Sequence, residues 1–343
     1  MSRTRRPRVA TLPILFAFLA AQLAAACTGG ASPTPVATPA PPASAAAATP
    51  APAVTPAPTP SPVAAFPVTV TGFDGTKVAI ESRPDRIVSL TPAVTETLFK
   101  IGAGDRVVGR SEDPNPYPAE AAGIPALTSM MAVDLEKVVA LEPDLVIAGG
   151  LGFTPDEAIA QLRNAGIPVL VVYATDVAGV LDDIRTIGTA AGETEAANTL
   201  ADTMRSGIDA VAVAAAAAGA TRPRVFYEID ATGDIYGPAD ASFIAEMVDL
   251  AGGDPITTGS PDVYSIPLER LIEANPEVIV LGDAAYGVTP EAVAARSGWG
   301  TMTAVKSGAI RPVDDIVITR PGPRLVEGLR ALADAINPGV ALP

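Results

Sequence analysis

An internal repeat constrains the fold of this chain more than any other feature. Residues 134–149 (DLEKVVALEPDLVIAG) match residues 267–282 (PLERLIEANPEVIVLG) at a constant offset of 133 positions. In each copy a short helix with an acidic and a basic residue leads through a proline to an apolar strand that ends at glycine. Since such a repeat is one supersecondary unit used twice, the chain is predicted to contain two lobes of similar structure.

Short apolar strands alternate with amphipathic helices around the first copy. Residues 86–90 (RIVSL) indicate a buried strand, and Pro92 begins a helix that Gly102 ends. Residues 145–148 and 169–173 predict two further buried strands. Alternation of this kind is typical of parallel α/β sheets.

The middle of the chain is expected to be helical. Between residues 177 and 220 there is no proline and no strand pattern, and residues 193–217 can form one continuous helix. At 1.5 Å per residue such a helix is about 37 Å long. Apolar residues recur along one face of it at Leu200, Met204, Ile208 and Val211. A helix of this length is expected to act as a strut between the lobes.

These patterns together predict the fold class and the domain boundaries. The fold class is α/β, with two similar α/β lobes joined by a single long helix. We expect an N-terminal lobe at residues 66–175, a helical linker with the long helix at 176–220, and a C-terminal lobe at 221–343.

The first 27 residues have the pattern of a lipoprotein signal sequence. Four arginines precede an apolar stretch from about Pro13 to Leu23, and three alanines lead to Cys27, the only cysteine in the chain. Ala24 stands where such sequences usually carry leucine. We predict that Cys27 is lipidated. An ordinary cleaved signal and an uncleaved N-terminal anchor are the alternatives.

Residues 28–65 are predicted to form a disordered stalk. They are nearly all Ala, Pro, Thr and Ser, and they carry no charge. Such a composition cannot bury enough surface to offset chain entropy, and its prolines favour an extended form of about 3.1 Å per residue. A stalk of this kind could hold a folded domain up to roughly 100 Å from a membrane. The expected location is therefore extracytoplasmic, with a lipid anchor in the cell membrane.

The charge balance excludes some partners. The chain has 23 Lys+Arg and 38 Asp+Glu, and removal of the four signal arginines leaves 19 basic residues. This acidic balance argues against nucleic acid and against adhesion to anionic lipid. With a single cysteine no disulfide is expected within the chain, so the folded part needs a hydrophobic core of its own.

The sequence offers little for catalysis. There is no histidine, which excludes a Ser-His-Asp triad and ordinary zinc sites. The glycine run Gly149-Gly150-Leu-Gly152 lacks the third glycine of a dinucleotide-binding loop. We predict that the protein is not an enzyme and has no metal site of its own.

Four stretches carry a resemblance to a known family: residues 86–99 (RIVSLTPAVTETLF), 134–147 (DLEKVVALEPDLVI), 242–253 (SFIAEMVDLAGG) and 320–329 (RPGPRLVEGL). With them the chain resembles, from Phe66 to Pro338, the helical-backbone (class III) substrate-binding proteins of ABC importers for cobalamin, ferric siderophores and haem. The resemblance implies a ligand held in a cleft between the lobes. It also implies that the joining helix permits only small closure.

The resemblance implies permease-docking roles for Glu136 and Glu269. In such proteins one glutamate on top of each lobe docks into basic residues of the permease. The repeat independently places these two acids at the same position of each lobe. The alternative is that each acid pairs locally with Lys137 or Arg270 or caps its helix.

For ligand binding, Tyr236 and Arg320 match ligand-contacting positions of the cobalamin binders, and Tyr264 lies within one residue of another. Met130 falls where those proteins can carry tryptophan. Tyrosines offer flat apolar faces with a hydroxyl, and arginine suits an anionic or amide-rich edge. The alternative is that the tyrosines are half-buried packing residues and that Arg320 forms a surface salt bridge.

The sequence ranks a corrinoid first as ligand, a ferric siderophore second and haem third. The single tryptophan, Trp299, is expected in the core, so a corrinoid would rest on tyrosine and methionine. Without histidine, a haem iron could be held only by tyrosine or methionine; the candidates are Tyr117, Tyr236, Tyr264, Met130 and Met131. A ferric siderophore brings its own iron ligands.

The predicted function is an extracytoplasmic, lipid-anchored substrate-binding protein of an ABC importer. It is expected to capture a metal chelate or macrocycle as a monomer and to deliver it to the permease and its ATPase. The alternatives are a siderophore or haem binder of the same importer class, and a surface lipoprotein that uses the fold without transport.

Overall fold

The computed structural model describes residues 66–129, 132–218 and 221–343. The predicted signal sequence with Cys27, the stalk at 28–65 and Met130 lie outside the described residues. All the described residues belong to one compact unit. Within the described ranges, no helix combines the length and the apolar character that a membrane span requires.

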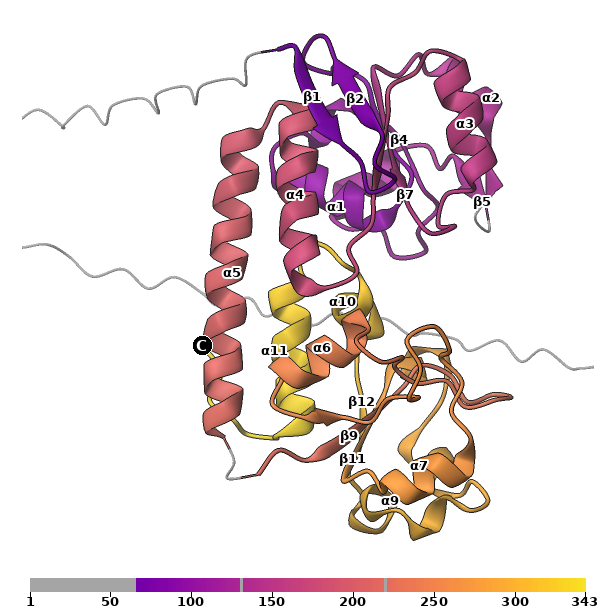
Figure 1. The fold of residues 1–343 in the computed structure, drawn as a ribbon, viewed down its shortest axis with the longest axis vertical. Helices are drawn as coiled ribbons and strands as arrows, with labels where there is room; N and C mark the ends of the chain where they lie inside the picture. The colour runs from indigo at the N-terminus through magenta and orange to yellow at the C-terminus, as the bar shows by residue number, and fades with distance from the viewer. Residues whose placement is uncertain (1–65, 130–131, 219–220) are drawn as a thin grey trace, which may run out of the picture. The chain divides into compact units, whose positions relative to one another are not determined.

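The N-terminal lobe is built on a parallel sheet with the strand order β4-β3-β7-β8 (Figure 1). Its strands are β3 (Ile87–Ser89), β4 (Val107–Arg110), β7 (Leu145–Gly149) and β8 (Val169–Val172). Along β3, neighbouring residues belong to two apolar clusters, since Ile87 packs with α1 and α4 and Val88 packs with α2 and α3. Burial on both faces explains the continuous apolar runs. The three strands predicted for this lobe are confirmed.

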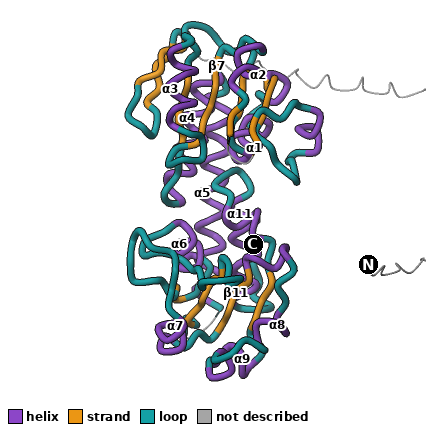
Figure 2. Tube along the Cα trace, turned by 90° about the vertical axis from the view of Figure 1, so that its right-hand side faces the viewer, coloured by secondary structure: helices purple, strands orange, loops and turns teal. Residues whose placement is uncertain are grey.

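The C-terminal lobe repeats this topology. Its parallel sheet has the order β10-β9-β11-β12. Figure 2 shows this lobe with β11 labelled, below the N-terminal lobe with β7. The strands are β9 (Arg224–Glu228), β10 (Asp254–Pro255), β11 (Val278–Leu281) and β12 (Ile310–Pro312). Counted along the chain within each lobe, both sheets have the order second, first, third, fourth. The two similar lobes predicted from the repeat are therefore confirmed.

Helices and two hairpins complete the lobes. The helices of the N-terminal lobe are α1 (Pro92–Lys100), α2 (Leu135–Ala140) and α3 (Asp156–Asn164). In the same lobe, β1 (Val68–Thr71) pairs antiparallel with β2 (Lys77–Ile80). Likewise, β5 (Thr128–Ser129) pairs antiparallel with β6 (Ala132–Val133). The C-terminal lobe holds α6 (Phe243–Leu250), α7 (Leu268–Ala274), α8 (Pro290–Ala294), α9 (Thr303–Ser307), α10 (Asp315–Thr319) and α11 (Leu325–Ile336).

Two antiparallel helices, α4 (Val177–Ala191) and α5 (Thr194–Ala217), connect the lobes (Figure 1). Helix α5 has 24 residues, which confirms the predicted long helix. The turn before α5 contains Gly192 with a φ of 77°, a left-handed conformation that glycine adopts without strain. Gly188 lets the helices approach closely, because a Cβ there would lie 2.1 Å from the Cβ of Ala197.

The largest apolar cluster runs through both lobes. It contains Ile87 and Leu98 of the first lobe, Met204 and Ile208 of α5, and Leu329 of the second lobe. Helix α11 packs against α5 and so continues this cluster into the C-terminal lobe. The lobes therefore share a helical core.

Candidate functional site

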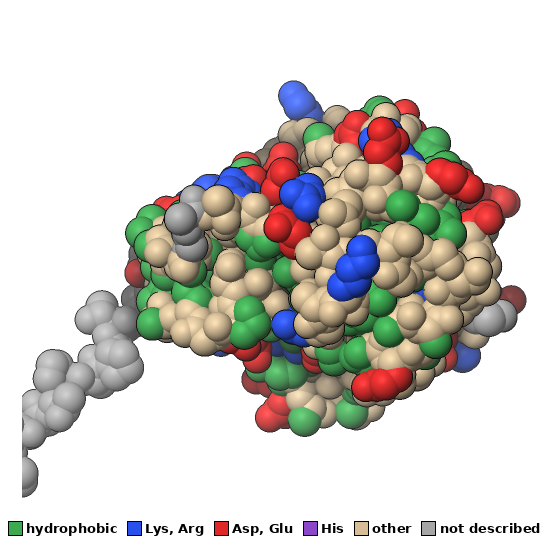
Figure 3. Space-filling view, turned by 90° about the horizontal axis from the view of Figure 1, so that it is seen from below, with side chains coloured by type: hydrophobic (Ala, Val, Ile, Leu, Met, Phe, Trp, Pro, Cys, Tyr) green, Lys and Arg blue, Asp and Glu red, His purple; other side chains and the backbone are tan. Residues whose placement is uncertain are grey.

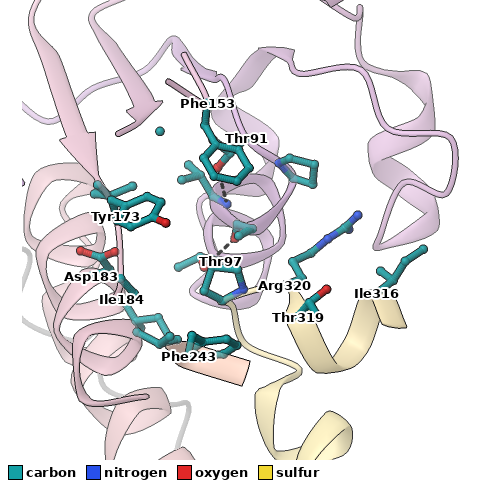
Figure 4. Close-up of a pocket in the computed structure, with 18 of the residues that line it drawn as sticks. Thr91, Thr97, Phe153, Tyr173, Asp183, Ile184, Phe243, Ile316, Thr319 and Arg320 are labelled. Atoms are coloured by element: carbon teal, nitrogen blue, oxygen red, sulfur yellow. Dashed lines mark hydrogen bonds between the residues drawn. The ribbon is translucent and has the colours of Figure 1, made fainter. Parts of the chain in front are cut away.

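A cavity of about 500 Å³ lies between the lobes and is lined by both (Figure 4). On the side of the N-terminal lobe, the lining residues 91–94 follow β3, Gly149 ends β7, and Phe153 follows β7. This side of the cavity therefore lies between β3 and β7, where the strand order of the first sheet reverses. Ligands of open α/β sheets bind at such a position, outside the carboxyl ends of the strands. The fold therefore places the cavity where a ligand site is expected.

The wall formed by the N-terminal lobe is aromatic. Phe153 and Tyr173 line the cavity, and Phe73 packs behind them. The ring centroids of Phe73 and Tyr173 are 5.3 Å apart, and those of Phe153 and Tyr173 are 6.0 Å apart. Burial, together with the nearby Tyr264, raises the pKa of Tyr173, so its hydroxyl stays protonated at neutral pH. The wall offers flat apolar faces with a hydroxyl donor.

The opposite wall comes from the C-terminal lobe. Phe243 and Ile244 at the start of α6 contribute apolar surface, and Tyr264 contributes a second tyrosine that is 44% exposed. After β12, Asp315, Thr319 and Arg320 contribute polar groups. The two lobes thus present aromatic side chains to one space, an arrangement suited to a large, flat ligand.

Helix α4 closes the cavity between the walls. Val180, Ile184 and Ile187 present an apolar face to it, and Asp183 is the single charged residue among the lining positions of this helix. Figure 4 shows Asp183 close to Tyr173, on the side of the cavity away from Arg320. The floor is therefore apolar with one carboxylate.

An ion-pair network joins the lobes at the Arg320 side of the cavity. Arg320 Nη1 donates to Glu96 Oε1 at 2.6 Å and to Asp113 Oδ2 at 3.0 Å. Arg324 donates to the same Glu96 through Nε at 2.9 Å and Nη2 at 2.7 Å. The Arg324 guanidinium also lies 4.4 Å from the ring centroid of Tyr117. We call Glu96, Asp113, Arg320 and Arg324 the ionic clasp.

The ionic clasp is mostly buried and electrically balanced. The side chains of Glu96 and Asp113 are 1% and 6% exposed, and those of Arg320 and Arg324 are 15% and 18% exposed. Hydrogen bonds to Glu96 raise the pKa of Arg324. Two arginines face two carboxylates, so the group has no net charge to offer a ligand.

The remaining charged groups in the cavity wall are acidic. Asp315 accepts a hydrogen bond of 2.7 Å from the hydroxyl of Tyr227 and one of 3.1 Å from Thr319. Burial raises the pKa of Tyr227, so this hydroxyl remains a donor. Asp183 receives no hydrogen bond from any described residue. Arg320 is the one basic side chain among the described residues that line the cavity, and the ionic clasp holds it.

The structure brings two of the four predicted ligand residues together. Tyr264 and Arg320 both line the cavity. Tyr236 does not line it, although its backbone pairs with Asp230 and Ser265, next to Tyr264. Met130 lies outside the described residues. The ligand-binding roles of all four residues stay predictions.

Sequence reasoning missed Phe153, Tyr173 and Phe243 as site residues. Each stands at or shortly after the carboxyl end of a strand, or at the start of a helix that follows one. A search of these positions for aromatic residues would have found the first two. Trp299, in contrast, is 3% exposed and lies under Arg296, so its predicted place in the core is confirmed.

The acids predicted to dock the permease lie outside the cavity. Glu136 in the first turn of α2 and Glu269 in the first turn of α7 are both exposed. Lys137 pairs with Asp134 at 2.7 Å, and Asp134 also caps α2. No described residue forms an ion pair or a side-chain hydrogen bond with Glu136 or Glu269. The two acids are therefore available to a partner.

The surface at the end of the C-terminal lobe carries charges of both signs. Viewed from the end of the C-terminal lobe, acidic and basic side chains are interspersed with neutral ones, and neither sign covers the face (Figure 3). Among the described residues, no group of three or more acidic, histidine or cysteine side chains could hold a metal ion.

Comparison with known proteins identifies the family. The periplasmic binding protein family pattern matches residues 87–316. The chain is 34% identical over 276 residues to the uncharacterized ABC transporter substrate-binding lipoprotein YvrC of Bacillus subtilis, covering 80% of this chain and 86% of that one. It is 32% identical over 286 residues to the cobalamin-binding protein of Halobacterium salinarum, covering 80% and 75% of the two chains.

A solved structure agrees with the sequence matches. A possible iron-binding (periplasmic solute-binding) protein from Staphylococcus epidermidis has a TM-score of 0.65 at 26% identity, covering 74% of this chain and 99% of that one. These matches confirm the family resemblance carried by the four stretches and the prediction that the chain is not an enzyme. The chain belongs to the periplasmic binding protein family, as a substrate-binding protein of the ABC-transporter class.

Proposed function

We propose that this protein is the extracytoplasmic, lipid-anchored receptor of an ABC importer and that its ligand is a corrinoid. The observation that carries the ligand class is the cavity between the lobes. Its walls are apolar and aromatic, and the described residues that line it supply no uncompensated cation. A corrin ring offers a broad apolar face to such walls, and its periphery carries uncharged amides.

The charges of the cavity disfavour haem. Haem carries two carboxylates, and a buried carboxylate needs a paired cation or several hydrogen-bond donors. Arg320 is held by Glu96 and Asp113, and Asp183 and Asp315 add negative charge. A ferric siderophore with uncharged hydroxamates meets none of these objections, so it is the second candidate.

A relative supports the corrinoid as the first candidate. The Halobacterium salinarum relative is named a cobalamin-binding protein and is 32% identical over most of both chains. The Staphylococcus epidermidis structure is described as a possible iron-binding protein at 26% identity.

The lipid anchor rests on the sequence before the lobes. Cys27 follows an apolar segment with small residues, and the stalk at 28–65 separates it from the folded unit. The Bacillus subtilis relative is named a lipoprotein. We propose that acylation of Cys27 holds the receptor at the outer face of the cell membrane.

Glu136 and Glu269 are the proposed contacts to the permease. Figure 1 shows α2 and α7 in the upper and lower lobes, both away from α5. Because the repeat places one exposed acid at the same position of each lobe, two similar permease subunits could each receive one. The partners proposed are therefore the permease and, through it, the ATPase.

Ligand titrations of the full-length protein test the proposed ligand class. Cyanocobalamin, hemin, ferrichrome and ferrioxamine B are added in turn, and absorbance and Trp299 fluorescence are followed. We expect cyanocobalamin to bind at micromolar concentration or below, worth at least about 8 kcal/mol. Saturable binding of hemin alone, or of a siderophore alone, would refute the corrinoid assignment and leave the receptor class in place.

Two tyrosine variants show whether binding occurs in the cavity. Tyr264→Ala should weaken cyanocobalamin binding by more than about 1 kcal/mol, because it removes an aromatic face from the wall. Tyr286→Ala is the matched control, since Tyr286 is 87% exposed and does not line the cavity. Equal losses in both variants would place the ligand elsewhere. Ligand binding without uptake in cells would favour a surface lipoprotein that does not transport.

A further inference from the structure

Asp183 is a carboxylate in an apolar part of the cavity wall. It projects from α4 next to Val180, Ile184 and Ile187, which line the same cavity. No described residue donates a hydrogen bond to it or forms an ion pair with it. A carboxylate in such surroundings is costly unless something compensates its charge. The described part of the protein does not supply that compensation.

None of the neighbouring charged groups compensates the Asp183 carboxylate. On α4 itself, Arg185 pairs with Asp182 at 3.2 Å and with Asp202 of α5 at 2.8 Å. From α6, Glu246 accepts the backbone N–H of Val177 at 2.8 Å and adds negative charge. Arg320 lies across the cavity from Asp183 (Figure 4).

The surroundings of Asp183 change its pKa. Burial, helped by the charge on Asp182, raises the pKa of Asp183 to about 7. Near neutral pH the group is therefore poised between its two forms, and a positively charged or hydrogen-bond-donating neighbour would favour the carboxylate. A bound ligand can supply such a neighbour.

We propose that Asp183 selects the charge of the ligand. Its carboxylate accepts a hydrogen bond from an uncharged amide of the chelate or pairs with a cationic group, and it repels a carboxylate placed on that side of the cavity. This inference rests on the proposed receptor function and adds to it a residue that the ligand contacts. The favoured ligands are uncharged or cationic chelates, and chelates with peripheral carboxylates are rejected.

Pairs of similar ligands that differ in charge test the proposal at pH 8. The first pair is cyanocobalamin and its b-, d- and e-monocarboxylic acids, in each of which one amide is replaced by a carboxylate. The second pair is ferrioxamine B, a cation, and its N-succinyl derivative, an anion. Affinities are measured for the full-length wild-type protein, Asp183→Asn and Asp182→Asn. Asn keeps the size of the side chain and removes its charge.

We expect the wild type to bind at least one anionic derivative about thirtyfold more weakly than its parent. The reason is repulsion between the carboxylate of the derivative and that of Asp183 in a partly buried site. In Asp183→Asn this preference should shrink to about threefold. Asp182→Asn, whose side chain is 77% exposed in the wild type, should keep the wild-type preference. If Asp183→Asn keeps the wild-type preference for the parent over the anionic derivative, the proposal is overturned. It is also overturned if the wild type binds every anionic derivative, or hemin, tightly.

The two pairs separate this inference from the proposed ligand class. If only the ferrioxamine pair binds and Asp183 governs its preference, the charge selection holds and the corrinoid assignment fails. If cyanocobalamin binds and the variant changes nothing, the corrinoid assignment holds and the charge selection fails. If neither pair binds, both fail.

A ligand-free measurement guards against a misfolded variant. A raised pKa means that the folded state holds its proton more tightly than the unfolded state, so the stability linked to Asp183 is lost as pH rises from about 4 to about 7. Asp183→Asn should therefore unfold at a higher temperature than the wild type at pH 8 and at a similar temperature at pH 4. No gain at pH 8 would mean that the carboxylate is compensated, and the proposal would fall.

Discussion

Replacing Glu96 by glutamine should destabilise the protein more than any other single charge removal described above. Glu96 accepts three hydrogen bonds from two guanidinium groups of the other lobe, and its side chain is 1% exposed. Removing one partner from a buried ion pair typically costs 3–5 kcal/mol, because the remaining charges stay buried without compensation. Since the two arginines are 15% and 18% exposed, water can approach them, and we expect about 3 kcal/mol, the lower end of that range.

Urea unfolding measured in parallel by circular dichroism and by Trp299 fluorescence checks this value. Trp299 is buried in the C-terminal lobe, so a difference between the two probes would show the lobes unfolding separately. Asp113→Asn removes a single hydrogen bond of 3.0 Å and should cost about 1–2 kcal/mol. Asp182→Asn removes an exposed pair and should cost less than about 1 kcal/mol.

The three variants must fall in this order for the reasoning to stand. A loss for Glu96→Gln no larger than that of Asp182→Asn would show that the ionic clasp contributes nothing to holding the lobes. Arg320 would then be free to pair with a carboxylate of a ligand, and haem would no longer be disfavoured.

Three further outcomes are expected. Cys27→Ala should leave the membrane fraction or be misprocessed, and its retention in membranes after signal cleavage would contradict lipidation. The double variant Glu136→Ala, Glu269→Ala should keep its ligand affinity and lose uptake, because docking to the permease weakens by about 2–5 kcal/mol if the charge pairs are buried in the complex. Removing two exposed acids of α5, Glu195 and Asp209, should change neither ligand affinity nor uptake. Asp283→Asn should stabilise the fold at pH 8 and not at pH 4 in thermal unfolding, because burial and the neighbouring Glu228 raise the pKa of Asp283. Equal effects at both pH values would contradict this.

The sequence was sufficient to predict the architecture because its signals are local. Apolar runs bounded by proline and glycine predicted β3, β7 and β8, and the absence of proline predicted the length of α5. The constant offset between two copies predicted that both sheets share one topology. None of these inferences needed knowledge of which residues meet across the molecule.

The site was less accessible because its contacts are not local. Glu96 and Arg320 are separated by 224 positions, and nothing in either stretch shows that they bind each other. Asp183 looks like an ordinary helix surface residue in the sequence, and only the packing of α4 beside the cavity gives it an apolar environment. Tyr264 and Arg320 were found through family resemblance, whereas Phe153 and Tyr173 required the positions of the strand ends.

The ionic clasp changes how the two lobes can move. Helices α4, α5, α6 and α11 pack together between the lobes and form the first attachment. Glu96, Asp113, Arg320 and Arg324 add a second attachment at the Arg320 side of the cavity. Any separation of the lobes on that side therefore requires these ion pairs to break first.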